Sequence, residues 1–141
     1  MKYEVFYFTR TGVSKRVAEK IGELLLCEPI EITDDMDWSG ASGFLKGGYY
    51  ASRKKSVQIK LSKPSEGKDI LVVVTPLWAG KIAPAIDAFL KKQDLKKVHL
   101  VVTSSGSTLK ERQGYCSITD IVKNRNDEAE CIQTLVSKLT E

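Results

Sequence analysis

Three short segments rich in hydroxyl and glycine residues contain the residues best suited to bind a ligand. In the first, three hydroxyl side chains and one glycine lie between a β-branched stretch and a helical repeat. Hydroxyl groups, a glycine that permits positive φ and the N–H groups of a helix start together can hold a phosphate. An ordinary capped turn uses the same residue types, so both interpretations remain open at this point. This segment consists of Thr9, Arg10, Thr11, Gly12, Val13 and Ser14.

The second and third segments each follow an apolar stretch. The second places a tryptophan between a proline and a glycine, where it is either an ordinary core residue or an aromatic wall for a flat ligand. The third is a run of small residues whose backbone amides could flank the same ligand. The second segment consists of Thr75, Pro76, Leu77, Trp78, Ala79 and Gly80, and the third consists of Ser104, Ser105, Gly106 and Ser107.

Strands and helices are predicted to alternate along the chain, because β-branched stretches alternate with apolar residues at helical spacing. This alternation requires an open parallel α/β sheet with helices on both faces. The carboxyl ends of parallel strands lie along one edge, so we expect the three segments to meet there. The predicted strands are residues 3–8, 27–32, 69–75, 98–103 and 115–122, and the predicted helices are residues 14–26, 83–92 and 127–139.

Three parts of the chain depart from this alternation. Pro29 interrupts the strand at 27–32, which predicts an edge position because proline cannot donate to the hydrogen-bond ladder. Residues 38–68 are broken by glycines and contain either a short amphipathic helix, which we favour, or a surface loop. The connection from Ser107 to Tyr115 leaves room for only a turn or two of helix, and Tyr115 is expected to pack on the sheet.

The amino-acid composition bears on the number of domains and on which kinds of binding site can be excluded. The chain has 141 residues, 42% hydrophobic and 28% charged, which predicts a single domain over residues 1–141. No apolar run approaches the ~20 residues of a membrane helix, so we expect a cytoplasmic protein without membrane insertion. The three cysteines lack C-x-x-C spacing, and neither disulfides nor a metal site is predicted. Basic residues at 53–55, 91–92 and 96–97 lack interleaved aromatics, which argues against nucleic-acid binding.

The three segments together resemble the flavodoxin family, in register along the whole chain. Residues 9–14 are similar to the family's Ser/Thr-x-Thr-Gly-x-Ser/Thr loop, which wraps the phosphate of FMN. Residues 75–81 resemble the second flavin loop, and residues 103–107 resemble the third, which lies along the pyrimidine side of the isoalloxazine ring. The resemblance implies a flavodoxin-like three-layer α/β/α sandwich with a five-stranded parallel sheet of order 2-1-3-4-5.

The resemblance also implies a function. It implies non-covalent FMN held by the three segments, no catalytic side chain, and electron transfer between redox partner proteins. The net charge of +4 differs from the acidic character of many flavodoxins and allows a partner with an acidic docking face. Two alternatives remain: an FMN-dependent oxidoreductase acting on a quinone or NAD(P)H, and a non-catalytic binding module of the same fold. The sequence is compatible with a monomer or a homodimer.

Overall fold

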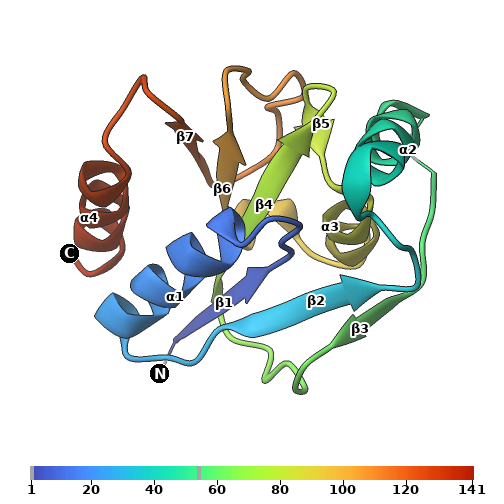
Figure 1. Ribbon diagram of the computed structural model, residues 1–141. Helices are drawn as coiled ribbons and strands as arrows, with labels where there is room; N and C mark the ends of the chain where they lie inside the picture. Colours follow the sequence, from blue (N-terminus) through green and yellow to red (C-terminus); the bar gives the residue numbers. More distant parts are fainter. Residues whose placement is uncertain (1, 54) are drawn as a thin grey trace.

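Five parallel strands form the centre of a single sheet (Figure 1). The structure is a computed structural model and describes residues 2–53 and 55–141; Met1 and Lys54, the middle residue of the basic run at 53–55, lie outside the described residues. The parallel strands are β1 (Tyr3–Tyr7), β2 (Ile30–Asp34), β4 (Ile70–Trp78), β6 (Val98–Ser104) and β7 (Ser117–Val122). They lie in the order β2-β1-β4-β6-β7, which is the predicted order 2-1-3-4-5.

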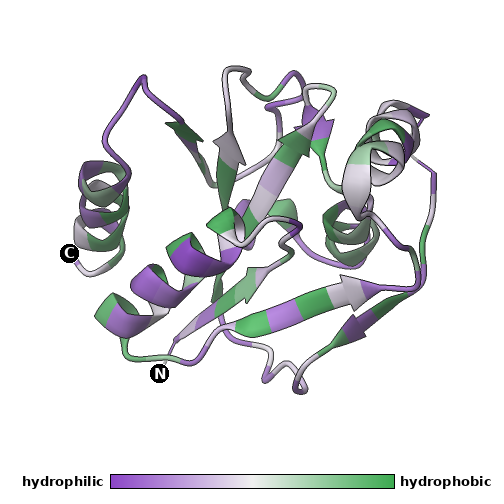
Figure 2. Ribbon diagram, viewed as in Figure 1, coloured by the Kyte–Doolittle hydropathy of each residue, from purple (hydrophilic) through white to green (hydrophobic). Residues whose placement is uncertain are grey.

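Two short antiparallel strands extend this sheet, and the sequence did not predict either of them. β3 (Ile59–Leu61) pairs with β2, and β5 (Lys81–Ile82) pairs with the end of β4. The prediction of an edge position for β2 is therefore wrong, because β3 covers its outer side. Pro29 does not interfere with this pairing, since it precedes the first residue of β2. Along β2, hydrophobic and hydrophilic residues alternate (Figure 2), as expected for a strand with one face in the core.

Helices cover both faces of the sheet, which confirms the three-layer arrangement. The helices are α1 (Val13–Leu25), α2 (Gly40–Arg53), α3 (Pro84–Leu90) and α4 (Glu128–Leu139), with a short 3-10 turn η1 (Leu95–Lys97). One hydrophobic cluster contains residues of α1 and α4, and the other contains residues of α2 and α3. The helix favoured within residues 38–68 is confirmed as α2. No helix in the described part of the chain has the length and hydropathy that spanning a membrane requires.

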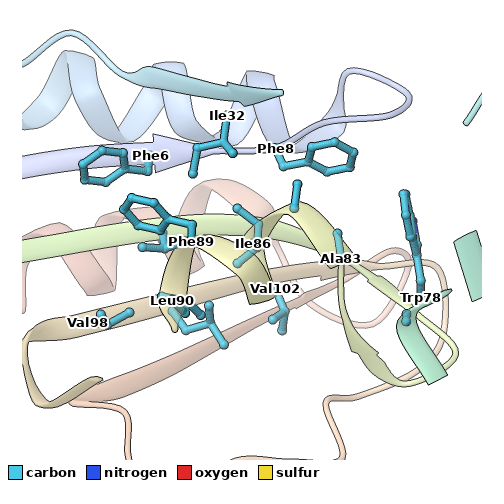
Figure 3. Packing of buried hydrophobic residues seen from close by; sticks show 14 of the residues in the cluster. Phe6, Phe8, Ile32, Trp78, Ala83, Ile86, Phe89, Leu90, Val98 and Val102 are labelled. Carbon is cyan, nitrogen blue, oxygen red and sulfur yellow. The ribbon is translucent and has the colours of Figure 1, made fainter. Parts of the chain in front are cut away.

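The hydrophobic cluster beneath α3 contains residues from the strands on both sides of β4 (Figure 3). Phe6 of β1 lies against Phe89 of α3, with ring centroids 4.6 Å apart. Val98 and Val102 of β6 belong to the same cluster and are almost fully buried. α3 begins with Pro84, whose fixed φ suits the first turn of a helix and whose missing N–H is not needed there.

The connection from β6 to β7 has no crossover helix. Residues 105–116, all of them described, form no helix, so the predicted turn or two of helix is absent. This extended connection instead carries Leu109 and Tyr115 onto the α3 face, where both pack against the hydrophobic cluster. Tyr115 lies before the first residue of β7 rather than within that strand.

Candidate functional site

The first loop joins β1 to α1 and leaves the start of the helix open to an anion. Gly12 is the N-cap residue and has a φ of 99°, a left-handed conformation that favours glycine. Its N–H donates to Thr9 Oγ1 over 2.9 Å, which closes the loop on itself. Among the described residues no side chain caps α1, and its first turn contains no acidic residue. The first N–H groups of α1 therefore point toward a region where negative charge is stabilised.

Thr11 and Ser14, the other two hydroxyl residues of this loop, have different surroundings. Thr11 is exposed, and its hydroxyl has no hydrogen-bond partner in the described parts of the chain. Ser14 is only 2% exposed, and its Oγ lies 3.0 Å from Oγ1 of Thr103 near the end of β6. The structure therefore leaves Thr11 available to a ligand, whereas the Ser14 hydroxyl is used inside the protein.

Arg10 links this loop to the start of α2. Its Nε donates to the carbonyl of Trp38 over 2.7 Å, and its Nη2 donates to the carbonyl of Gly40 over 2.8 Å. The guanidinium carbon also lies 5.8 Å from the ring centroid of Phe44. Arg10 thus holds α2 next to the first loop, a role that sequence reasoning missed.

The second loop is shorter than predicted, because β4 continues through Trp78. Residues 75–78 are therefore strand residues, and the chain reverses over Ala79 and Gly80 alone, since Trp78 pairs with Lys81. Both turn residues have positive φ, 52° and 76°, as a two-residue hairpin turn of this kind requires. Left-handed backbone costs a non-glycine residue about 1 kcal/mol, so Ala79 stores strain at the exposed tip of this turn.

Trp78 belongs to the core in this structure. It is 8% exposed, and its ring centroid lies 5.6 Å from that of Phe8 and 5.1 Å from that of Trp38. α2 covers it, and a Cβ atom at Gly47 would come within 2.9 Å of the indole, so glycine permits this close approach. The indole therefore packs inside the protein against Phe8 and Trp38, beneath α2, rather than standing as an open aromatic wall.

The third loop follows β6 and is exposed on its outer side. Ser104 Oγ donates to the carbonyl of Ser107, and the Lys123 N–H donates to the carbonyl of Ser104 over 2.9 Å. Ser105, Gly106 and Ser107 are exposed. Farther along, the N–H of Lys110 donates to the carbonyl of Gly80 over 2.9 Å, which attaches this connection to the second loop.

Direct contacts bring the three loops together at one edge of the sheet. The Ser14–Thr103 hydrogen bond joins the first to the third, and the edge contact between Phe8 and Trp78 joins the first to the second. The three predicted segments therefore lie together in the structure. Thr75 differs from the others, because it is fully buried and its Oγ1 accepts a hydrogen bond from the N–H of Ala83.

Asp34 and Trp38 form a second feature that the sequence analysis missed. Both carboxylate oxygens of Asp34 accept from the indole Nε1 of Trp38, over 2.9 and 2.8 Å. Burial raises the pKa of Asp34, and the hydrogen bonds from Trp38 and the Met36 N–H oppose this rise. The sequence contained one signal for this contact, which is an acidic residue four positions before a tryptophan. This contact holds the indole of Trp38 against the indole of Trp78, and α2 packs on the Trp78 ring at Gly47.

Several solved structures share the fold of this chain over nearly its whole length. No protein-family model matches the sequence, and no curated protein sequence matches it either. A candidate flavoprotein from Bacteroides eggerthii is 23% identical and aligns over 99% of this chain and 98% of its own, with a TM-score of 0.69. A flavoprotein from Lactobacillus acidophilus, solved in complex with FMN, is 20% identical over 99% of both chains, with a TM-score of 0.65. A candidate flavoprotein from Bacteroides uniformis is 20% identical, over 95% of this chain and 97% of its own, with a TM-score of 0.70.

These alignments agree with the order of the parallel strands. The fold is flavodoxin-like. In a flavodoxin-like fold, the strand order reverses between the first and third parallel strands, and ligands bind outside the carboxyl ends at that point. Here these strands are β1 and β4, so the switch point lies between the first loop and the Ala79–Gly80 turn.

Proposed function

We propose that this protein binds FMN and transfers electrons between redox partner proteins. The observation that carries the proposal is the uncapped start of α1, which has no acidic residue in its first turn and lies at the switch point of a flavodoxin-like fold. A protein with the same fold has been solved with FMN bound, which supports this choice of ligand. FMN would supply reversible one- and two-electron reduction, which no amino-acid side chain of the site provides.

The residues at the site fit a phosphate monoester attached to a flat ring. The N–H groups at the start of α1 and the exposed hydroxyl of Thr11 would hold the phosphate. A Cβ atom at Gly12 would meet nothing within 4 Å, so there is open space beside the loop. The Ala79–Gly80 turn and residues 104–107 would border the ring, and the hydrogen bond from the Lys110 N–H to the Gly80 carbonyl holds the turn in place.

The outward face of α2 is the proposed docking surface for a redox partner. Phe44 is 63% exposed and Leu45 is 73% exposed, and the helix contains Lys46 and Arg53 but no acidic residue. The guanidinium carbon of Arg53 and the Nζ of Lys55 both lie within 6 Å of the Tyr49 ring centroid. An apolar surface with basic residues complements a partner that presents acidic residues around an apolar patch.

Titration of the purified protein with FMN tests the proposal. We expect saturable binding of one FMN per chain, measured by quenching of flavin fluorescence. Thr11→Ala is expected to weaken binding, whereas Thr134→Ala, which removes an exposed hydroxyl on α4, serves as the matched control. Absence of tight FMN binding by the wild-type protein would refute the proposal.

A pocket beside the second loop favours a second candidate, an FMN-dependent oxidoreductase acting on a quinone or NAD(P)H. Its volume is about 250 Å³, and its walls include both residues of β5, which directly follow Gly80. A carrier requires only an exposed ring edge, whereas an enzyme requires a substrate site. Sustained oxidation of NAD(P)H by the FMN-loaded protein in the presence of a quinone would favour the enzyme over the carrier.

A further inference from the structure

The pocket lies beside the β6–β7 connection, which contains no crossover helix between residues 105 and 116. In place of a helix, this connection places only Leu109 and Tyr115 against the α3 face. The space beside them is bordered by α2, β5, α3, η1 and the connection itself, is open to solvent on one side, and measures about 250 Å³. Its apolar lining consists of Ala51, Ile82, Pro84, Leu90, Leu95 and Leu109.

The charged side chains at the pocket are paired with one another. Lys81 Nζ lies 3.6 Å from a carboxylate oxygen of Glu111, and Lys91 Nζ lies 3.6 Å from a carboxylate oxygen of Asp87. These two lysines and two carboxylates sum to zero charge, and all four line the pocket. Because these charges cancel, the walls give a charged ligand no net electrostatic attraction, whereas an uncharged ligand loses little on leaving water.

Tyr115 supplies an uncharged hydrogen-bond donor at the wall of this pocket. Its hydroxyl has no hydrogen-bond partner within the described residues, although the side chain is half-buried. Burial raises the pKa of Tyr115, and the negative charges of Asp87 and Glu111 raise it further. The phenol therefore keeps its proton at neutral pH and can donate to an acceptor oxygen.

We infer that this pocket is a binding site for an uncharged one- or two-ring compound that carries a carbonyl oxygen, the chemistry of a quinone. A volume of about 250 Å³ equals that of about eight liquid waters, which suits a small bicyclic ring rather than a drug-sized molecule. The apolar residues contact the ring, and the Tyr115 hydroxyl donates to the carbonyl. Binding here does not depend on FMN; only the placement of the ring next to a flavin rests on the proposed function.

Binding of 1-tetralone, a bicyclic ketone that does not react with thiols, tests this inference on the protein without added FMN. We expect saturable changes in the amide chemical shifts of Ile82, Leu109 and Tyr115, with a Kd of about 0.1 to 1 mM. Tyr115→Phe keeps the ring and is expected to weaken tetralone binding by roughly three- to tenfold. Binding of tetralin, which lacks the oxygen, should not change in this variant. Tyr3→Phe is the matched control, because the Tyr3 hydroxyl donates to the Leu139 carbonyl at α4, on the opposite face.

Three results would overturn the inference. These are the absence of saturable shift changes up to about 5 mM tetralone, shift changes located outside the pocket, and tighter binding of the anion 1-naphthoate than of tetralone. An unchanged tetralone affinity in Tyr115→Phe would overturn the assignment of the phenol as donor. Because the experiment omits FMN, failure of FMN binding and failure of the pocket are separate results.

Discussion

Two hydroxyls of the first loop, three residues apart, are expected to respond differently to removal. Ser14 is 2% exposed, and its Oγ lies 3.0 Å from the hydroxyl of Thr103, which is 5% exposed. Ser14→Ala would leave the Thr103 hydroxyl without this partner in a buried position, at a cost of about 1–2 kcal/mol in the free energy of unfolding. For a chain of this size the loss corresponds to a fall in Tm of roughly 3–8 °C. The N–H of residue 14 remains, so we expect FMN affinity to change by less than about threefold.

Thr11→Ala is expected to have the opposite effects. Thr11 is exposed, so its truncation should change the free energy of unfolding by no more than about 0.5 kcal/mol. A hydrogen bond to a charged phosphate contributes about 1.5–3 kcal/mol, so FMN affinity should fall by roughly ten- to a hundredfold.

Urea unfolding and FMN titration of both variants separate these two roles. Thr103→Val completes a double-mutant cycle with Ser14→Ala, and we expect a coupling energy of about 1 kcal/mol. If Ser14→Ala left stability unchanged but abolished FMN binding, Ser14 would contact the phosphate rather than Thr103, and its structural role would be excluded.

Three further changes test other parts of the structure. Ala79→Gly should raise the free energy of unfolding by about 0.5 kcal/mol in urea unfolding, because glycine adopts the φ of 52° without strain; a loss of stability would contradict the turn geometry. Glu4→Ala should lower the free energy of unfolding by about 2–4 kcal/mol in urea unfolding. Its buried carboxylate accepts hydrogen bonds from Ser65 Oγ and from the backbone N–H groups of Glu66 and Lys68. Burial lowers the pKa of His99 below 6.5, so the unfolded chain binds the proton more readily and stability should fall as the pH drops below that value. Urea unfolding at about pH 7.5 and about pH 5.5 should show a smaller difference in His99→Gln, and an equal difference would exclude His99 as the cause.

The sequence predicted the path of the backbone because its signals are local. The apolar run before Thr75 indicated a central parallel strand, and the glycine at position 12 indicated a left-handed turn before a helix. Hydrophobic alternation did not show that residues 59–61 would pair with β2, because a three-residue strand carries too little pattern. The sequence also could not show where β4 ends, since Pro76 and Trp78 are compatible with both a strand and a loop.

The order of the elements, and the meeting of three loops at one edge of the sheet, follow from the order of residues, because connection rules for parallel strands depend only on succession along the chain. Which side chains of those loops remain available to a ligand depends on packing between distant segments. Trp78 is buried because α2, more than 20 residues earlier, covers it, and Ser14 is occupied because Thr103 lies opposite. The pocket beside Tyr115 likewise arises from the packing of α2 and α3 against a connection without a helix. Contacts between residues so distant in sequence leave no local pattern, and only the folded chain contains them.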